Sequence, residues 1–272
     1  MEKEIFQRAQ LLLGSRVMER MANARVILFG VGGVGSWCAE GLVRSGIRRL
    51  TIVDSDRVCP SNINRQLMAT TQTVGQIKVD ALKEHLLLVN PEAQIDSRHE
   101  VFNEATSEGF HLEEYDYIVD AIDSLKDKML LIQMATRTDA VLFSSMGAAL
   151  KLDPTTIRVA EFWKVKGCPL AKALRQRFKK QKTRPSKKFL CVFSEQLLKN
   201  KGAADFTETV VHIPVPEGEH RSSNPRANGS LLHMTGIYGF TLAGLVVKDI
   251  VQKTEELSAG QETSGHEIPH TP

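Results

Sequence analysis

The fold is decided by the stretch Val26-Ile-Leu-Phe-Gly-Val-Gly-Gly-Val-Gly35, in which an apolar run leads into a glycine loop. The spacing Gly30-x-Gly32-x-x-Gly35 between a strand and a helix is the dinucleotide-binding fingerprint. The first glycine permits a tight turn, the second lets a phosphate or ribose approach the backbone, and the third lets helix and strand pack closely. A tight turn without a ligand is the alternative interpretation.

Strands and helices alternate along the chain after this loop. The apolar runs predict strands at 50–53, 94–98, 116–119 and 140–145, and the intervening periodic segments predict helices at 34–45, 76–89 and 125–137. This alternation is typical of a parallel sheet with helices on both faces. Beyond Gly147 the pattern changes to that of antiparallel strands, and Pro169 opens a basic helix. We therefore predict an α/β fold: a Rossmann-like doubly wound, mainly parallel sheet extended by antiparallel strands, with a basic helix.

Composition and cysteine spacing limit the class of protein. The 272 residues, 42% hydrophobic and 25% charged, are typical of a soluble globular protein. The four cysteines form no C-x-x-C pair, so we expect reduced thiols in a cytoplasmic protein. The apolar stretch 231–251 contains His233 and ends in charged residues, which favours a buried helix over stable membrane insertion. Peripheral association with a membrane stays open.

Polar residues follow the second strand of the predicted sheet. Asp54 ends this strand about twenty residues after the glycine loop, where an acid can accept the ribose hydroxyls. Asp56 is also predicted to bind the nucleotide, although its side chain can instead cap the following loop. Arg65 and Lys78 supply the fixed cations that a polyphosphate needs, one as a bidentate fork and one as a point charge. Taken singly, each of these residues also fits an ordinary surface position.

A late acid completes the predicted site. Asp123 follows the strand that ends at Asp120, and ligands of parallel sheets lie at the carboxyl ends of strands. A carboxylate there can hold Mg²⁺ against phosphate oxygens, whereas the alternative role for Asp123 is a helix N-cap. Asn62 and Gln66 accompany Arg65 in one short segment. Together these residues predict an ATP and Mg²⁺ site, a combination that hydride transfer does not require.

Six motifs in order give the chain a resemblance to the adenylating enzymes related to ubiquitin-activating enzyme. They are Gly30 to Gly35, Asp54-x-Asp56, Ser61-Asn-Ile-Asn-Arg-Gln66, Gly75-Gln-x-Lys78, Asn90-Pro91 and Asp120-x-x-Asp123. That family adenylates a carboxylate with Mg-ATP and releases pyrophosphate. The resemblance implies that Gly32 and Gly33 approach the nucleotide, that phosphates lie near Asn62, Arg65 and Lys78, and that Asp123 holds magnesium. It also implies a homodimer in which Arg8 enters the partner's site.

Within that family, the downstream half resembles the tRNA threonylcarbamoyladenosine dehydratases. The matching stretches are Gly147-Ala, Lys151 to Thr155, Pro169 to Lys172, Cys191 to Glu195 and Gly229-Ser230. This branch implies ATP-dependent ring closure on a modified adenosine next to a tRNA anticodon, with loss of water, and a bound Na⁺ or K⁺. This chain departs from that branch at two places. Leu150 stands where the branch usually has a polar residue, and the Phe-Val-Pro pattern expected after Gly229 does not occur. Both departures concern the substrate pocket.

The segment 172–188 carries nine Lys and Arg residues and no acid. Such a run favours a polyanion partner, here tRNA, over a solvated helix face. The residues predicted to contact it are Lys172, Arg175, Arg177, Lys179, Lys180 and Lys182. We expect one adenylating domain over 1–253, a tRNA-binding insert around 165–195 and a disordered tail over 254–272. Cys191 is interpreted as a buried strand thiol and, less simply, as a nucleophile.

Three rival functions remain at this stage. The first is an activator of a ubiquitin-like sulfur-carrier protein, although the zinc-binding cysteine pairs usual in such activators are absent from the sequence. The second is an NAD-dependent dehydrogenase, which leaves Arg65, Lys78 and Asp123 without a shared task. The third is a scaffold subunit without catalysis. The need for a sulfurtransferase partner stays open.

Overall fold

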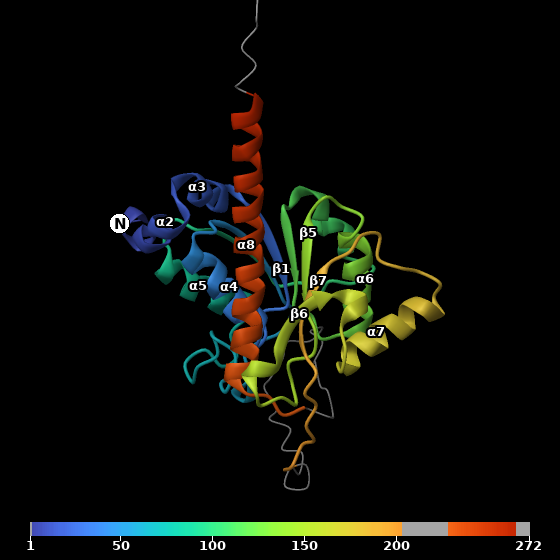
Figure 1. Ribbon diagram of the computed structural model, residues 1–272. Coiled ribbons are helices and arrows are strands. Elements are labelled where there is room, and N and C mark those ends of the chain that lie inside the picture. Colours follow the sequence, from blue (N-terminus) through green and yellow to red (C-terminus); the bar gives the residue numbers. More distant parts are fainter. Residues whose placement is uncertain (1, 203–227, 265–272) are drawn as a thin grey trace, which may run out of the picture.

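The computed structural model describes residues 2–202 and 228–264 of the chain, arranged around one seven-stranded sheet (Figure 1). The sheet order is β3-β2-β1-β4-β5-β7-β6. In that order the strands are β3 Gln94–Arg98, β2 Arg49–Val53, β1 Arg25–Phe29, β4 Tyr117–Asp120, β5 Val141–Ser145, β7 Leu190–Ser194 and β6 Ile157–Glu161. Six strands run parallel and β6 pairs antiparallel with β7. The doubly wound, mainly parallel sheet predicted from the sequence is confirmed.

Helices cover both faces of the sheet because its strands are apolar on both sides (Figure 1). One core contains Val26 and Leu28 of β1 together with residues of α4 (Gly35–Ser45), α5 (Lys78–Val89) and α8 (Leu232–Ser264). The other contains Ile27 and Phe29 of β1 with residues of α6 (Leu125–Ala135) and α7 (Pro169–Lys180). Successive residues of one strand thus point into different cores.

Short helices complete the described chain. The N-terminal helices are α1 Glu2–Ile5, α2 Gln7–Leu13 and α3 Ser15–Asn23, and the 3₁₀ turns are η1 Pro60–Asn62, η2 Ser107–Phe110, η3 Leu112–Glu114, η4 Pro154–Thr156 and η5 Phe162–Lys164. The strand order reverses direction between β1 and β4, and doubly wound sheets bind their ligands in a crevice outside the carboxyl ends of the strands at such a point. We call the region at the carboxyl ends of β1 and β4 the crevice. The glycine loop after β1 and the Asp123 loop after β4 both open onto this crevice.

Two details differ from the sequence predictions. Only β6 is antiparallel among the described strands, because the chain returns through α7 as a crossover and brings β7 in parallel to β5. The predicted disordered tail is wrong for residues 254–264, since α8 continues to Ser264. The remainder of that tail lies outside the described residues.

Helix α8 is the apolar C-terminal segment of the sequence. Over Leu232–Ala259 it has the length and hydropathy that a membrane span requires, yet half of its apolar window is buried inside the protein. The buried residues recur every fourth position: Met234, Tyr238, Leu242, Val246 and Ile250. They pack against α4 and β5, in agreement with the buried helix that the sequence predicts.

Candidate active site

The glycine loop folds tightly between β1 and α4. Gly30 has a φ of +84°, and a Cβ on it would lie 2.7 Å from the carbonyl oxygen of Ala121. A Cβ on Gly35 would lie 1.8 Å from the carbonyl oxygen of Gly30, so neither position tolerates a side chain. The N–H groups of Gly30 and Val31 are already bonded, to Val53 and Asp54. Because the loop opens a helix, the N–H groups at its helix end can serve as anion donors.

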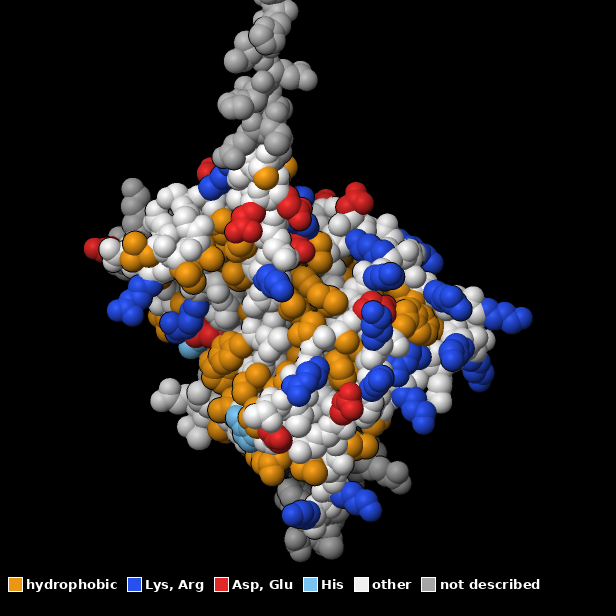
Figure 2. All heavy atoms as spheres, in the orientation of Figure 1, with side chains coloured by type: hydrophobic (Ala, Val, Ile, Leu, Met, Phe, Trp, Pro, Cys, Tyr) orange, Lys and Arg blue, Asp and Glu red, His pale blue; other side chains and the backbone are white. Residues whose placement is uncertain are grey.

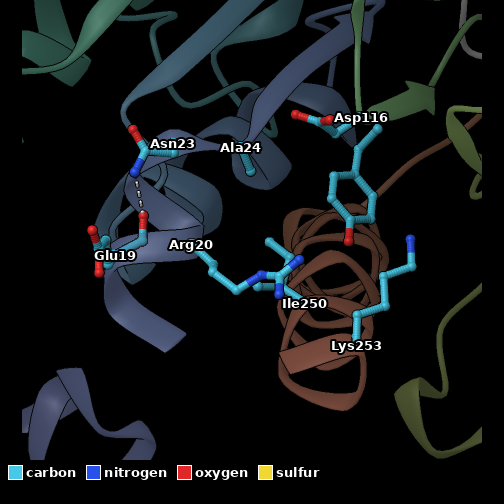
Figure 3. A pocket seen from close by; sticks show the side chains of 8 residues that line it. Glu19, Arg20, Asn23, Ala24, Asp116, Ile250 and Lys253 are labelled. Carbon is cyan, nitrogen blue, oxygen red and sulfur yellow. Dashed lines mark hydrogen bonds between the residues drawn. The ribbon is translucent and has the colours of Figure 1, made fainter. Parts of the chain in front are cut away.

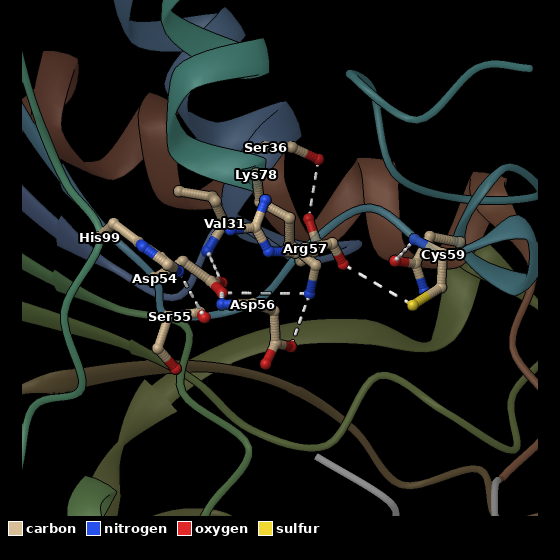
Figure 4. A network of polar contacts seen from close by, with 11 residues as sticks. Val31, Ser36, Asp54, Ser55, Asp56, Arg57, Cys59, Lys78 and His99 are labelled. Carbon is tan, nitrogen blue, oxygen red and sulfur yellow. Dashed lines mark hydrogen bonds and ion pairs between the residues drawn. The ribbon is translucent and has the colours of Figure 1, made fainter. Parts of the chain in front are cut away.

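Asp54 closes the adjacent strand and holds the loop in place. Its Oδ2 accepts the N–H of Val31 at 2.8 Å, and its Oδ1 accepts the N–H of Asp56 at 2.9 Å (Figure 4). Burial raises the pKa of Asp54, and the nearby Lys78 ammonium partly opposes that shift. Each carboxylate oxygen keeps a second lone pair, so Asp54 can still accept a ribose hydroxyl.

Lys78 is the first residue of α5 and is 5% exposed. Its Nζ lies 2.7 Å from Oδ2 of Asp56 and 3.9 Å from Oδ1 of Asp54 (Figure 4). Burial alone lowers the pKa of Lys78, but Asp54 and Asp56 outweigh it and the net pKa is raised. The ammonium is therefore held charged at the edge of the crevice, where a phosphate can exchange with Asp56.

Residues 62–66 pack over the glycine loop. The side chain of Arg65 lies against Gly33, where a Cβ would come within 3.2 Å of its Cγ. Its guanidinium donates to the carbonyl of Ser61 at 2.8 Å, and Nε1 of Trp37 donates to the carbonyl of Arg65 at 2.9 Å. Asn62 is buried and accepts the N–H of Cys59 through Oδ1 at 3.0 Å, which shapes the turn.

Gln66 carries a buried polar atom beside the glycine loop. It is 6% exposed, and its Oε1 is buried without a hydrogen-bond partner in the described structure. Its Nε2 lies 3.8 Å from the position of a Cβ on Gly32. A buried amide oxygen without a donor is costly, so a polar ligand over the glycine loop fits this position.

Asp123 lies on the loop between β4 and α6, and its side chain is exposed. Burial lowers the pKa of Arg65 while Asp123 opposes that shift, so the two charges lie within electrostatic reach. The N-cap of α6 is Ser124, whose Oγ accepts the N–H of Asp127. The alternative interpretation of Asp123 as a helix cap is therefore wrong, and its carboxylate is available to a metal.

These residues fit a magnesium nucleotide. Arg65 packs on Gly33, Asp54 binds Val31 of the glycine loop, and Lys78 lies 3.9 Å from Asp54. Asp123 follows β4 at the same edge of the sheet. A hard divalent cation needs one or two carboxylates beside phosphate oxygens, and Asp123 is the exposed carboxylate that could supply one. Within the described residues, no group of three or more metal-ligating side chains occurs.

A buried ion pair beneath this site was missed in the sequence. Lys128 of α6 and Asp120 of β4 are fully buried, with Nζ 2.8 Å from Oδ2. The sequence places Asp120 at the end of a strand, and its pattern assigns Lys128 no role. The available signal was a lysine on the apolar, sheet-facing side of the predicted helix 125–137.

Arg8 lies apart from this cluster. It is exposed on α2, a helix without buried residues, and no hydrogen bond or ion pair joins it to the crevice within the described chain. A cavity of about 460 Å³ also lies elsewhere, at the amino ends of the strands between α3 and α8 (Figure 3). Its lining mixes Arg20 and Lys253 with Glu19 and Asp116, which does not suit a polyphosphate.

Helix α7 presents its cations to solvent. Ala171, Leu174 and Phe178 form its buried face, so Phe178 is a core residue. On the other faces Lys172, Lys179 and Lys180 are exposed and Arg177 is partly exposed, and Lys182, just after the helix, is exposed as well. Arg175 instead donates to the carbonyl of Phe162 at 3.1 Å. Basic side chains crowd this flank of the molecule (Figure 2).

Cys191 of β7 lies inside the protein. The thiol is buried, and burial raises its pKa well above the usual value. All four cysteines are free. The interpretation of Cys191 as a buried strand thiol is confirmed, and a protonated buried thiol is a poor nucleophile.

Comparison with known proteins identifies a family and several relatives that the chain resembles. The ThiF family matches residues 6–264. A tRNA threonylcarbamoyladenosine dehydratase of Bacillus subtilis is 41% identical over 65% of this chain and 69% of its own length. The Escherichia coli tRNA threonylcarbamoyladenosine dehydratase is 32% identical over 89% of this chain and 91% of its own length. An adenylyltransferase and sulfurtransferase of Culex quinquefasciatus is 32% identical over 52% of this chain and 32% of its own length.

Solved structures agree with the sequence matches. The Escherichia coli tRNA N6-threonylcarbamoyladenosine dehydratase, TcdA, in complex with ATP is 29% identical, covers 95% of this chain and 97% of its own, and has a TM-score of 0.77. The complex of the same enzyme with AMP has a TM-score of 0.79. The family expected from the six motifs is thus confirmed over nearly the whole length, and the chain belongs to the ThiF family.

Proposed function

We propose that this chain is an ATP-dependent tRNA threonylcarbamoyladenosine dehydratase. The observation that carries the proposal is the extent of the match: the Escherichia coli dehydratase aligns with 89% of the chain, beyond the nucleotide-binding half that all adenylating relatives share. The converging cluster of Asp54, Arg65, Lys78 and Asp123 supports an ATP site in this chain.

The proposed reaction has two steps. An oxygen of the threonyl carboxylate attacks the α-phosphorus of ATP, an O–P bond forms, and pyrophosphate leaves. The carbamoyl group then closes onto the activated carbonyl carbon, AMP leaves with the carboxylate oxygen, and a proton is released. The net change in the nucleoside is the loss of one water. Ring closure within one molecule needs orientation more than an enzyme nucleophile, and Cys191 is too deeply buried to serve as one.

The cluster can stabilise the charge that develops in the first step. Arg65 and Lys78 would face the pyrophosphate oxygens, while Asp54 would accept ribose hydroxyls. Asn62 and Gln66 complete the wall, and the Gly30–Gly35 loop supplies N–H donors. Mg²⁺, held by Asp123, would neutralise phosphate charge. A bound Na⁺ or K⁺, suggested by the family resemblance, stays part of the proposal without a located site.

Helix α7 would hold the tRNA. Its exposed lysines carry no acidic partners on the same helix, so they are free to contact phosphates. Such contacts position a nucleic acid without reading its sequence. Arg175 is the least available of the predicted contacts because its guanidinium is already bound to Phe162.

A homodimer would complete the site. Helix α2 has no buried residues, and its Leu11 and Leu12 are more than 80% exposed. Apolar side chains this exposed are suited to a partner surface. Arg8 on the same helix would then reach the second subunit's crevice. A sulfurtransferase-system partner remains compatible with this arrangement. A cytoplasmic location is part of the proposal and is supported by the bacterial tRNA-modifying relatives.

The direct test is to incubate the protein with Mg-ATP and tRNA that carries threonylcarbamoyladenosine, and to weigh the nucleosides by mass spectrometry. The proposal predicts loss of one water from that nucleoside. An activator of a sulfur-carrier protein would instead exchange pyrophosphate into ATP only with a Gly-Gly-ending protein. Nicotinamide binding would favour a dehydrogenase, and no ATP turnover with any substrate would favour a scaffold.

A further inference from the structure

The buried pair of Lys128 and Asp120 lies directly beneath the loop that carries Asp123. Nζ of Lys128 lies 2.8 Å from Oδ2 of Asp120, and both side chains are fully buried. Ser144 of β5 donates its hydroxyl to the same Oδ2 at 2.6 Å. Desolvation of two charges offsets most of their attraction, so a buried pair of this kind is weak evidence for a role in stability alone.

The ion pair forms hydrogen bonds with both the N–H and the carbonyl of Ile122. Oδ1 of Asp120 accepts the N–H of Ile122 at 3.1 Å, and Nζ of Lys128 donates to the carbonyl of Ile122 at 2.9 Å. That carbonyl belongs to the planar peptide unit whose nitrogen is that of Asp123. Lys128 therefore fixes the peptide that leads into Asp123.

The two ends of the loop are fixed as well. At its start, the N–H of Ala121 donates to the carbonyl of Phe29 at 2.8 Å, and the carbonyl of Ala121 packs against Gly30. At its end, Ser124 caps α6. Asp123 thus projects from a short loop held at both ends and in the middle, while its own side chain is exposed.

We propose that Lys128 and Asp120 are positioning residues that hold the Asp123 carboxylate in place for Mg²⁺. The inference rests on the proposed role of Asp123 in the ATP site. Groups that orient a metal ligand commonly change metal affinity 10- to 100-fold when removed, although they never touch the metal. A core residue that only fills space would lack this effect.

The first experiment uses the ligand-free protein and measures hydrogen exchange of the amides of residues 121–124. The variant is Lys128→Met, which keeps the length of the side chain and removes the bond to Ile122. Lys151→Met is the matched control, because Lys151 is also buried, at 4% exposed, and donates to a backbone carbonyl, that of Gln196. We expect exchange at 121–124 to quicken at least tenfold in Lys128→Met alone. Unchanged exchange in a folded variant would overturn the inference.

The second experiment measures ATP binding by calorimetry, once with Mg²⁺ and once with EDTA. The ratio of the two dissociation constants gives the metal gain, which is the factor by which Mg²⁺ strengthens ATP binding. Lys128→Met should reduce that gain roughly tenfold and leave metal-free ATP binding little changed. Lys128→Arg should keep part of the gain. A structural role alone would lower Tm and weaken both bindings alike, which would overturn the inference.

Milder variants keep the test decisive if Lys128→Met does not fold. Ser144→Ala removes one donor to Asp120 and preserves the ion pair, so it should reduce the metal gain by a smaller factor. An unchanged gain in both Ser144→Ala and Lys128→Arg would overturn the inference.

The outcomes separate this inference from the proposed function. If Mg²⁺ no longer strengthens ATP binding in Asp123→Asn but still does so in the Lys128 variants, only the positioning role is defeated. A metal gain lost in both, in a protein that does not dehydrate tRNA, supports the positioning role and defeats the proposed function.

Discussion

The nucleotide crevice and helix α7 hold their cations in opposite ways. In the crevice, Lys78 is buried and bound to Asp56 at 2.7 Å, and Arg65 is anchored to the carbonyl of Ser61. On α7, Lys179 and Lys180 are exposed and face solvent. A fixed cation can distinguish a transition state from its ground state, whereas a mobile one supplies attraction without geometry. We therefore expect changes in the crevice to affect turnover and changes on α7 to affect binding and its salt dependence.

The largest effect is expected from Arg65→Ala. Removal of a fixed donor from a developing charge costs about 10²- to 10³-fold in turnover. Since the guanidinium is partly exposed, Tm should change little. Single-turnover rates of nucleoside dehydration, with Tm as the control for folding, measure this. Turnover at the rate of the unaltered protein would exclude Arg65 from a phosphate role.

Lys78→Met should cost stability as well as activity, because it leaves Asp54 and Asp56 without their cation. We expect a loss of about 1–3 kcal/mol in the free energy of unfolding. The pKa of Lys78 is raised in the folded state, so its contribution is complete below the unfolded pKa of about 10.4 and is lost as pH rises through the folded pKa. The difference between the two proteins in urea unfolding should stay constant from about pH 7 to 10 and shrink above that range. A difference that grows with pH would contradict the ion pair.

On α7, the double change Lys179→Ala/Lys180→Ala should weaken tRNA binding roughly tenfold at moderate salt. Each lost phosphate contact lowers the salt slope of log K by about one. The measurement is tRNA affinity across a salt series, with ATP affinity expected to stay unchanged. Lys83→Ala/Lys248→Ala removes the same charge elsewhere and should keep the slope. Equal slopes in the two variants would remove α7 from the tRNA surface.

The smallest effect separates two neighbouring residues. Ser124→Ala removes the N-cap of α6 and should cost about 0.5–1 kcal/mol of stability with little change in turnover. Asp123→Asn should do the reverse, with unaltered Tm and a raised Mg²⁺ requirement. Chemical unfolding and a magnesium titration of turnover check the pair. Reversed results would make Asp123 the cap and leave the metal without a ligand.

The sequence predicted most of what is local in this molecule. The strands, the glycine loop and the helix opened by Pro169 follow from apolar runs and turn residues that lie next to each other in the chain. What it did not predict depends on partners distant in sequence. The bond from Lys78 to Asp56 and the bond from Lys128 to Asp120 arise only when strands and helices pack.

Two further corrections have the same cause. The direction of β7 is set by the crossover through α7, which its own residues do not encode. The choice of Ser124 over Asp123 as cap depends on a backbone angle rather than residue type, since both types cap helices well.

The central claim is that the crevice transfers AMP to a carboxylate. Its most direct measurement is the nucleotide product of a single turnover with Mg-ATP and tRNA that carries threonylcarbamoyladenosine. The account predicts one AMP and one pyrophosphate for each nucleoside that loses water. ADP and inorganic phosphate in that ratio, or dehydration without ATP cleavage, would contradict it.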